Sequence, residues 1–277
     1  MSHFVPLGFG WQPCAPDYRD YGPSSPPVAT LLERLRPGTG GIPTSVDLRE
    51  YFLAAEDQLN LPASCAHACL GLVQYFERRA HGRLLRPSWL FLHQNARRWV
   101  EGSGGLDLRV TFKAMQHCGV PPERFWPYQT ERVDALPDAF LYSFQDPYRG
   151  LHYLRLDERK ASGGEVLGRV KAFAAAGFPC CFGCSIPNSL TLDGQIPYRP
   201  TFDSPLGGQA LIVAGYDDRW LRGSRGALLV RSSWGSAWGE HGYGWLPYAF
   251  VEERLAVDFF TLVHPSWIDS GEFDAPC

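Results

Sequence analysis

Apolar residues along this chain recur first with a helical period and later in short continuous runs. From about residue 64 to residue 80 they return every three or four positions, and His81-Gly82 suits the end of such a helix. The first part of the chain is therefore predicted to be mostly helical. By the same criterion, further helices are expected at 87–100, at about 106–118 and at 163–176.

The pattern of apolar residues changes after Gly177. Residues 178–186, 209–216 and 226–234 are short runs rich in apolar residues, which is typical of buried strands. Helices that come first and strands that come second predict an α+β chain with two segregated lobes.

The domain organisation follows from these patterns. Residues 1–44 are rich in Pro, Gly and Tyr, and we expect an arm that lies on the main body, with one helical pattern at 28–36. The body is predicted to be one domain over 45–277. Within it we expect a helical lobe at about 45–140, a β lobe at about 141–265 and a C-terminal tail at 266–277.

Composition narrows the classes of partner. The net charge is −3 and no basic stripe is present, which argues against nucleic acid. No run of 18 apolar residues occurs, so no membrane span is expected, and the first residues lack the pattern of a secretory signal. We therefore expect a cytoplasmic protein. The pattern predicts no particular oligomeric state.

The eight cysteines are expected to be reduced thiols, because the chain is long and no secretory signal points to an oxidising compartment. Cys180, Cys181 and Cys184 are spaced somewhat like a metal site. On a strand, however, Cys181 would face away from the other two, so we expect no metal and no other cofactor.

One segment has the residues of a thiol-dependent acyl-transfer site. Gln58 is followed by Ser64-Cys65 at the start of the first long helix. A thiol at a helix N-terminus feels the positive end of the helix dipole, which favours the thiolate. A Gln amide together with a backbone N–H can stabilise an oxyanion.

Two later segments complete a pattern. Residues 232–244, SSWGSAWGEHGYG, hold Trp and Gly at fixed offsets, and Gln209-Ala210 opens an apolar run that ends in Gly-Tyr. With Gln58 and Cys65, these segments resemble the papain-like cysteine peptidases, in particular bacterial-type members. The resemblance covers about residues 43–265 and implies a two-lobe fold with a cleft between a helical lobe and an antiparallel β-barrel-like lobe.

The resemblance also implies roles for single residues. Cys65 stands at the nucleophile position and Gln58 at the oxyanion position, although their spacing is one residue longer than in papain. Gly104, Gly105 and Trp234 stand where the family binds peptide. Two catalytic positions are changed, because Gln209 replaces the histidine and Ser232 replaces the asparagine that orients it. The separation of Cys65 and Gln209 matches the roughly 130–150 residues expected between nucleophile and histidine.

The two replacements remove the means of proton transfer. Amide hydrolysis needs a base for the nucleophile and an acid for the leaving amine, and a Gln amide is neither near neutral pH. His67 lies about 200° round the helix from Cys65, so we expect it to point away. Peptidase turnover is therefore not expected.

Three functions remain open. The first is a pseudopeptidase that binds an extended peptide or a protein tail in the cleft. The second is a Cys65-dependent acyltransferase or cyclase acting on a carrier-bound thioester, since a thiolate leaves without a strong acid. The third is a residual cysteine peptidase.

Overall fold

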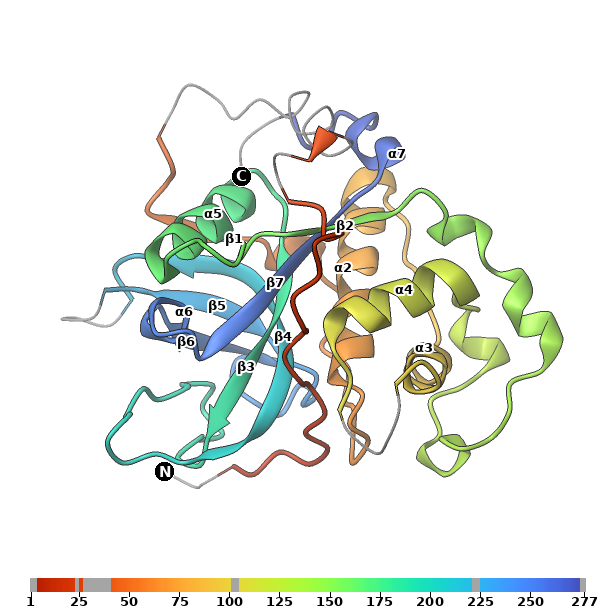
Figure 1. The fold of residues 1–277 in the computed structure, drawn as a ribbon, viewed down its shortest axis with the longest axis horizontal. Coiled ribbons are helices and arrows are strands. Elements are labelled where there is room, and N and C mark those ends of the chain that lie inside the picture. Colours follow the sequence, from red (N-terminus) through yellow and green to blue (C-terminus); the bar gives the residue numbers. More distant parts are fainter. Residues whose placement is uncertain (1–3, 23–24, 27–40, 101–104, 221–224, 275–277) are drawn as a thin grey trace.

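The structure is a computed structural model, and it describes residues 4–22, 25–26, 41–100, 105–220 and 225–274. Three helices, α2, α3 and α4, lie together on one side of the molecule, and the strands lie on the other (Figure 1). The two groups of elements meet along α2, which packs against β4. The predicted α+β arrangement in two lobes is confirmed.

The helical lobe is built from α2 (Ser64–His81), α3 (Trp89–Arg97) and α4 (Leu108–Cys118). Gly82 ends α2 in the left-handed conformation, with its N–H donating to the carbonyl groups of Arg78 and Glu77. Ser88 and Asp107 cap α3 and α4 by accepting from backbone N–H groups with their side chains. Short 3-10 helices extend this part of the chain at Arg49–Tyr51, Glu123–Phe125, Thr130–Arg132, Ala139–Ser143 and Asp146–Tyr148.

The other lobe is an antiparallel sheet with the strand order β2-β7-β3-β4-β5-β6, and β1 pairs with β4 beside this path. Helix α5 (Gly163–Ala175) contacts β3 and β4, and α6 (Ala249–Glu252) contacts α5 and β7. The strands are β1 (Ser45–Asp47), β2 (His152–Arg155), β3 (Cys180–Pro187), β4 (Pro205–Asp217), β5 (Ala227–Arg231), β6 (Tyr243–Pro247) and β7 (Ala256–Val263).

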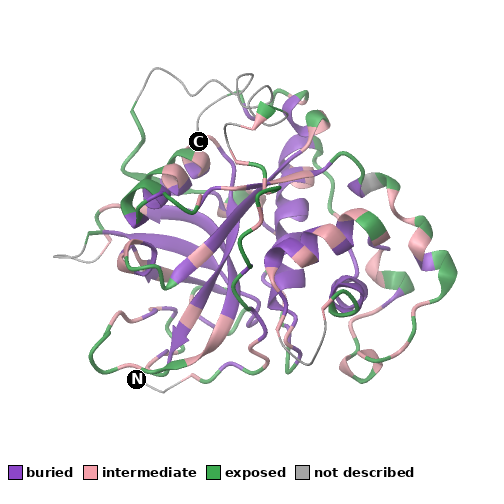
Figure 2. Ribbon diagram, in the orientation of Figure 1, coloured by how far each residue is buried: buried purple, intermediate pink, exposed green. Residues whose placement is uncertain are grey.

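The core is continuous across both lobes. Most of α2, nearly all of β3 and β5, and the part of β4 from Gln209 to Tyr216 are buried, and they form the purple centre of Figure 2. Gly71 lies where α2 crosses β4, and a Cβ at this position would come within 2.6 Å of the Ile212 side chain. The absence of a side chain at Gly71 therefore lets the middle of α2 approach β4 closely.

Several predicted boundaries need correction. The helix expected at 87–100 is shorter, because Pro87 precedes the Ser88 cap instead of entering the first turn. Residues 45–47 were expected in the helical lobe but form β1 in the sheet. The tail was expected to begin at 266, yet α7 (Pro265–Ile268) packs on α2 with Trp267 stacked on Phe76. The helical pattern at 28–36 lies outside the described residues.

Four strands were not predicted from the sequence. The pattern gave no signal for β1, β2, β6 or β7. The partners of β1, β2 and β7 are distant in the chain, whereas β6 pairs with the preceding strand β5. In the described part of the chain, no helix has both the length and the apolar character needed to cross a membrane.

Candidate functional site

The first turn of α2 presents Ser64 and Cys65 in different directions, because successive side chains on a helix are about 100° apart. Ser64 Oγ accepts a hydrogen bond of 3.3 Å from the N–H of Ala210, which directly follows Gln209 on β4. Cys65 Sγ lies 3.2 Å from the carbonyl oxygen of Leu106 and donates to it. Ser64, and not Cys65, therefore faces the strand that holds the histidine position.

The surroundings of Cys65 disfavour its thiolate. The residue is fully buried, and this burial raises the pKa of the thiol well above its ordinary value. Cys14 and Asp107 are close enough to raise the pKa further. The role of Cys65 as nucleophile stays a prediction, and no hydrogen bond among the described residues joins its sulfur to Gln58, Gln209 or Ser232.

Ser64 was missed because Cys65 was identified by residue type. The spacing was the signal that could have found it, because the separation from Gln58 to Cys65 along the sequence is one residue longer than in papain. A count at the papain spacing from Gln58 ends on Ser64. The structure agrees with that count.

Gln58, Gln209 and Ser233 form a buried network, here called the amide cluster. Gln58 Oε1 accepts from Gln209 Nε2 at 2.9 Å and from Ser233 Oγ at 2.5 Å. Gln209 Nε2 also lies 3.1 Å from Ser233 Oγ. All three side chains are neutral, so Gln209, at the predicted histidine position, neither takes up nor releases a proton near pH 7.

The expected partner of Gln209 was Ser232, and the structure differs. Ser232 Oγ donates to the carbonyl oxygen of Gly242 at 3.1 Å and accepts from the N–H of Trp234 at 3.3 Å. It thereby holds the turn after β5. The neighbouring Ser233 contacts Gln209 instead, because alternate residues of an extended chain point to opposite sides.

The oxyanion position is occupied by the chain itself. Gln58 Nε2 donates to the carbonyl oxygen of Gly8 at 2.7 Å, and it lies 3.0 Å from that of Leu61. A third contact, of 3.3 Å, reaches the carbonyl oxygen of Leu7. Gln58 therefore binds a peptide carbonyl of the N-terminal arm, residues 4–22.

The arm runs between the lobes and hydrogen-bonds to both (Figure 1). Gly10 O accepts from the N–H of Leu106 at 2.6 Å, and the N–H of Gln12 donates to Leu106 O at 3.0 Å. On the sheet side, the N–H groups of Gly10 and Trp11 lie 3.2 and 3.1 Å from Gly208 O. The predicted cleft is thus filled by an extended peptide segment of the same chain.

Two of the three predicted peptide-binding residues touch this arm. A Cβ at Gly105 would overlap the carbonyl group of Gly10, so this glycine permits the close approach. The ring of Trp234 meets that of Phe4 edge-on, with centroids 5.9 Å apart. Gly104 lies outside the described residues.

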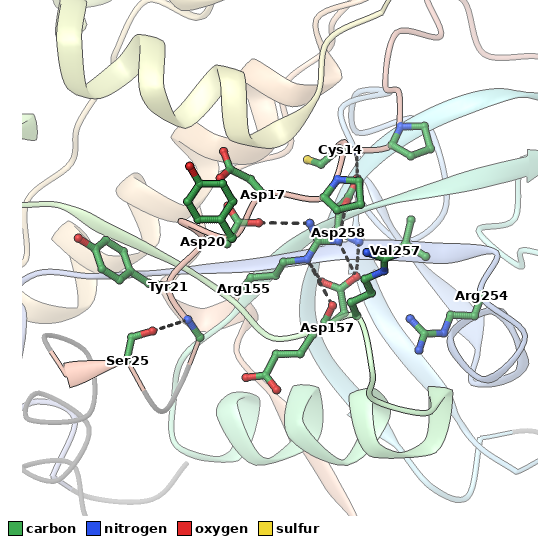
Figure 3. A pocket seen from close by; sticks show the side chains of 16 residues that line it. Cys14, Asp17, Asp20, Tyr21, Ser25, Arg155, Asp157, Arg254, Val257 and Asp258 are labelled. Atoms are coloured by element: carbon green, nitrogen blue, oxygen red, sulfur yellow. Dashed lines mark hydrogen bonds and ion pairs between the residues drawn. The ribbon is translucent and has the colours of Figure 1, made fainter.

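Charged residues hold the later part of the arm, in what we call the ionic anchor: Asp20, Arg109, Arg155, Asp157 and Asp258. Arg155 forms ion pairs of 3.0 Å with Asp157 and 2.7 Å with Asp258, and it lies 3.5 Å from Asp20. Arg109 pairs with Asp20, and Asp258 accepts from the N–H of Cys14 at 2.7 Å. Figure 3 shows Asp20, Arg155, Asp157 and Asp258 around a pocket of about 770 Å³ that they line with other residues of the arm.

His67 does not replace the missing histidine. Its ring stacks on Trp89, with centroids 5.6 Å apart, and meets Tyr128 edge-on. Burial, together with the positive charge of Arg231, lowers the pKa of His67 to about 3, so the imidazole is neutral. No hydrogen bond among the described residues joins it to Ser64 or Gln209.

Within the described residues, no group of three or more His, Cys, Asp or Glu side chains is arranged to hold a metal ion. The seven cysteines described there are free thiols, and none forms a disulfide.

Comparisons with known proteins fit this geometry. No family model matches the chain. An uncharacterised peptidase C1-like protein of Acanthamoeba polyphaga mimivirus is 26% identical over 278 residues, which cover 93% of this chain and 87% of the viral protein. Xylellain, a cysteine protease from Xylella fastidiosa, is 27% identical with a TM-score of 0.76, and the match covers 95% of this chain and 98% of xylellain.

This chain is a homologue of the papain-like cysteine peptidases. Its fold is papain-like, with the two lobes and the cleft of that architecture. Procathepsin B from Trypanosoma congolense, which is 20% identical, shares the fold with a TM-score of 0.60 over 84% of this chain and 79% of its own.

Proposed function

We propose that this papain-like homologue does not hydrolyse peptides and instead binds an extended peptide or protein tail in the cleft between its lobes. The observation that supports this most strongly is the hydrogen bond from Gln209 Nε2 to Gln58 Oε1. It ties the residue at the histidine position to the residue at the oxyanion position. Neither side chain titrates near neutral pH, so neither supplies the two proton transfers of amide hydrolysis.

Ser64 is the second support for lost proteolysis. A serine hydroxyl needs an adjacent base to become a nucleophile. Ser64 Oγ instead accepts from a backbone N–H, and the neighbouring residue of β4 is Gln209. Loss of one member of a catalytic unit typically lowers the rate by about 10³–10⁶.

The retained cleft supports the binding role. The arm already lies in it. Its backbone donates to the carbonyl groups of Gly208 and Leu106 and accepts from the N–H of Leu106 and from the Gln58 amide. Main-chain pairing of this kind gives affinity to extended peptides with little dependence on catalytic groups. A partner's tail would use the same donors and acceptors.

The acyltransferase alternative depended on an available Cys65 thiolate. The thiol is buried with a raised pKa and donates to Leu106 O, which are not the conditions of a reactive cysteine. No observation favours this alternative or a residual peptidase over the binding role.

The test compares four forms of the full-length chain: wild type, Cys65→Ser, Gln209→His with Ser232→Asn, and those two changes combined with Ser64→Cys. Each form is assayed for cleavage of fluorogenic peptides and for labelling by a thiol-reactive acyl probe, with and without Trp11→Ala to weaken the arm. We expect no cleavage by wild type or Cys65→Ser. We expect any restored cleavage only where Ser64→Cys and Gln209→His are both present.

Two results would contradict the proposal. If wild type cleaves peptides and either Cys65→Ser or Ser64→Ala abolishes that cleavage, the chain is a peptidase. If wild type is labelled at Cys65 by the acyl probe under native conditions, acyl transfer replaces binding as the better proposal.

A further inference from the structure

The part of the arm that lies deepest in the cleft has an alternating composition. Residues 7–12 are Leu-Gly-Phe-Gly-Trp-Gln, with glycine at positions 8 and 10, aromatic residues at positions 9 and 11, and no charged residue. Each of these two kinds of position meets a different surface of the body. The contacts of this segment therefore indicate which side chains fit at each position of the cleft.

The glycine positions leave no room for a side chain. A Cβ on Gly8 would overlap the carbonyl oxygen of Leu61, and Gly8 also has a φ of 75°, which side-chain-bearing residues rarely adopt. A Cβ on Gly10 would overlap Pro62. Both contacts are to backbone or to a rigid proline ring, so the body cannot move aside easily.

At the aromatic positions, Phe9 and Trp11, the large side chain belongs to the arm and the glycines belong to the body. A Cβ on Gly207 would lie 2.6 Å from the ring of Phe9. The Trp11 indole lies against Gly183, where a Cβ would overlap it, and against Gly208, where a Cβ would lie 2.8 Å from Cε3. Trp11 is consequently only 7% exposed.

We propose that the cleft recognises uncharged, extended segments of the sequence Gly-aromatic-Gly-Trp, either in the arm itself or in a peptide that displaces it. This inference rests on the proposed binding function and adds its specificity. Glycine is selected where the ligand backbone meets Leu61 and Pro62. A ring is selected where the body presents Gly207, Gly183 and Gly208.

A ligand added in trans must compete with the tethered arm. A short tether gives a segment an effective concentration of about the millimolar range. The ionic anchor at Asp20, Arg109 and Arg155 holds the arm near the cleft even when residues 7–12 are displaced. The experiment therefore weakens the arm within the full-length chain.

The first measurement uses Gly10→Ala, with Trp11→Ala as a second variant and Gly168→Ala as the matched control. A Cβ at Gly168 meets nothing within 4 Å. Hydrogen exchange of the Leu106 amide, which donates to Gly10 O in the native chain, reports whether the arm is seated. We expect faster exchange in both arm variants and unchanged exchange in the control.

The second measurement is fluorescence anisotropy with labelled peptides. The peptide Leu-Gly-Phe-Gly-Trp-Gln should bind both arm variants. Peptides with alanine at the second glycine or at the tryptophan should bind about tenfold more weakly or worse, since one clash or one lost ring costs enough binding free energy to raise the dissociation constant by at least that factor. Gly183→Ala, added to either arm variant, should weaken the parent peptide to a similar degree.

The outcomes separate this inference from the proposed function. If diverse extended peptides bind the opened cleft equally well, the sequence preference is wrong and the binding function stands. If no extended peptide binds although Leu106 exchange shows an unseated arm, the binding function itself is wrong. If hydrogen exchange of the Leu106 amide stays as slow in Gly10→Ala as in wild type, the steric requirement for glycine is wrong. The proposed sequence preference is then wrong as well.

Discussion

The amide cluster and the ionic anchor are both largely buried and both contact the arm, yet they are built from opposite kinds of side chain. The cluster of Gln58, Gln209 and Ser233 is neutral, and hydrogen bonds join its three members, although the buried Gln209 Oε1 has no hydrogen-bond partner among the described residues. The anchor around Arg155 contains several charges, two of them on the almost fully buried Asp157 and Asp258. Buried charges are costly unless each is paired, whereas neutral amides need only hydrogen bonds.

The difference shows where the chain places its charge. The amide cluster is neutral, whereas charged side chains hold the arm beside the cleft. We therefore expect substitutions in the ionic anchor to lower the free energy of unfolding more than substitutions in the amide cluster do.

The largest effect is expected from Arg155→Met. This change removes the positive partner of Asp157, Asp258 and Asp20, and an uncompensated buried charge costs about 3–5 kcal/mol. Urea unfolding should show the loss in free energy of unfolding. Arg19→Ala, which breaks an exposed pair with Asp17, is the control and should leave the midpoint unchanged. An unchanged midpoint for Arg155→Met would remove the contrast between the two regions.

A smaller loss is expected from Gln209→Ala. Gln58 Oε1 would keep Ser233 as a donor but lose the 2.9 Å bond from Gln209, at a cost of about 1–3 kcal/mol. The same urea titration measures it, with the exposed Gln12→Ala as control. A loss as large as that of Arg155→Met would contradict the view that neutral amides are the less costly arrangement.

A third test concerns pH, which should act through charged sites and not through the cluster. Burial raises the pKa of Glu123 from 4.5 to about 7, with Glu56 adding to the rise and the N–H of Tyr128 opposing it. Because the folded state holds this proton more tightly than the unfolded state, the contribution of Glu123 to stability is present below about pH 4.5 and is lost as the pH rises toward 7.

The comparison for this test is Glu123→Gln against wild type, by unfolding free energies measured from pH 4 to pH 8. The variant should show a flatter profile across that window, whereas Gln209→Ala should keep the wild-type slope. A changed slope in Gln209→Ala would mean that the cluster is coupled to a titrating group.

The smallest effect is expected from Cys65→Ser on peptide binding, because the thiol contacts Leu106 O and not the amide cluster. In native wild type, iodoacetamide should modify the half-buried Cys118 before Cys65, as judged by peptide mass mapping. Rapid modification of Cys65 in the native protein, or loss of peptide binding in Cys65→Ser, would show that Cys65 is a functional residue of the site.

Several features were determined by the sequence alone, because they depend on neighbours along the chain. Ser162 and Glu165 form a capping box at the start of α5, and Gly82 ends α2, as local patterns predict. The Trp and Gly offsets at 232–244 were sufficient to indicate the fold. The sequence also has Gln209 at the position where the family resemblance implies a histidine.

Other features were decided only by the tertiary structure, because they depend on contacts between distant segments. Helical periodicity places Ser64 and Cys65 about 100° apart, but only the packing of α2 on β4 decides that Ser64 is the one facing Gln209. The choice of Ser233 over Ser232 depends on the path of the chain after β5. The docking of the arm between Leu106 and Gly208 is set by glycines that are far apart in sequence and complementary only in the folded state.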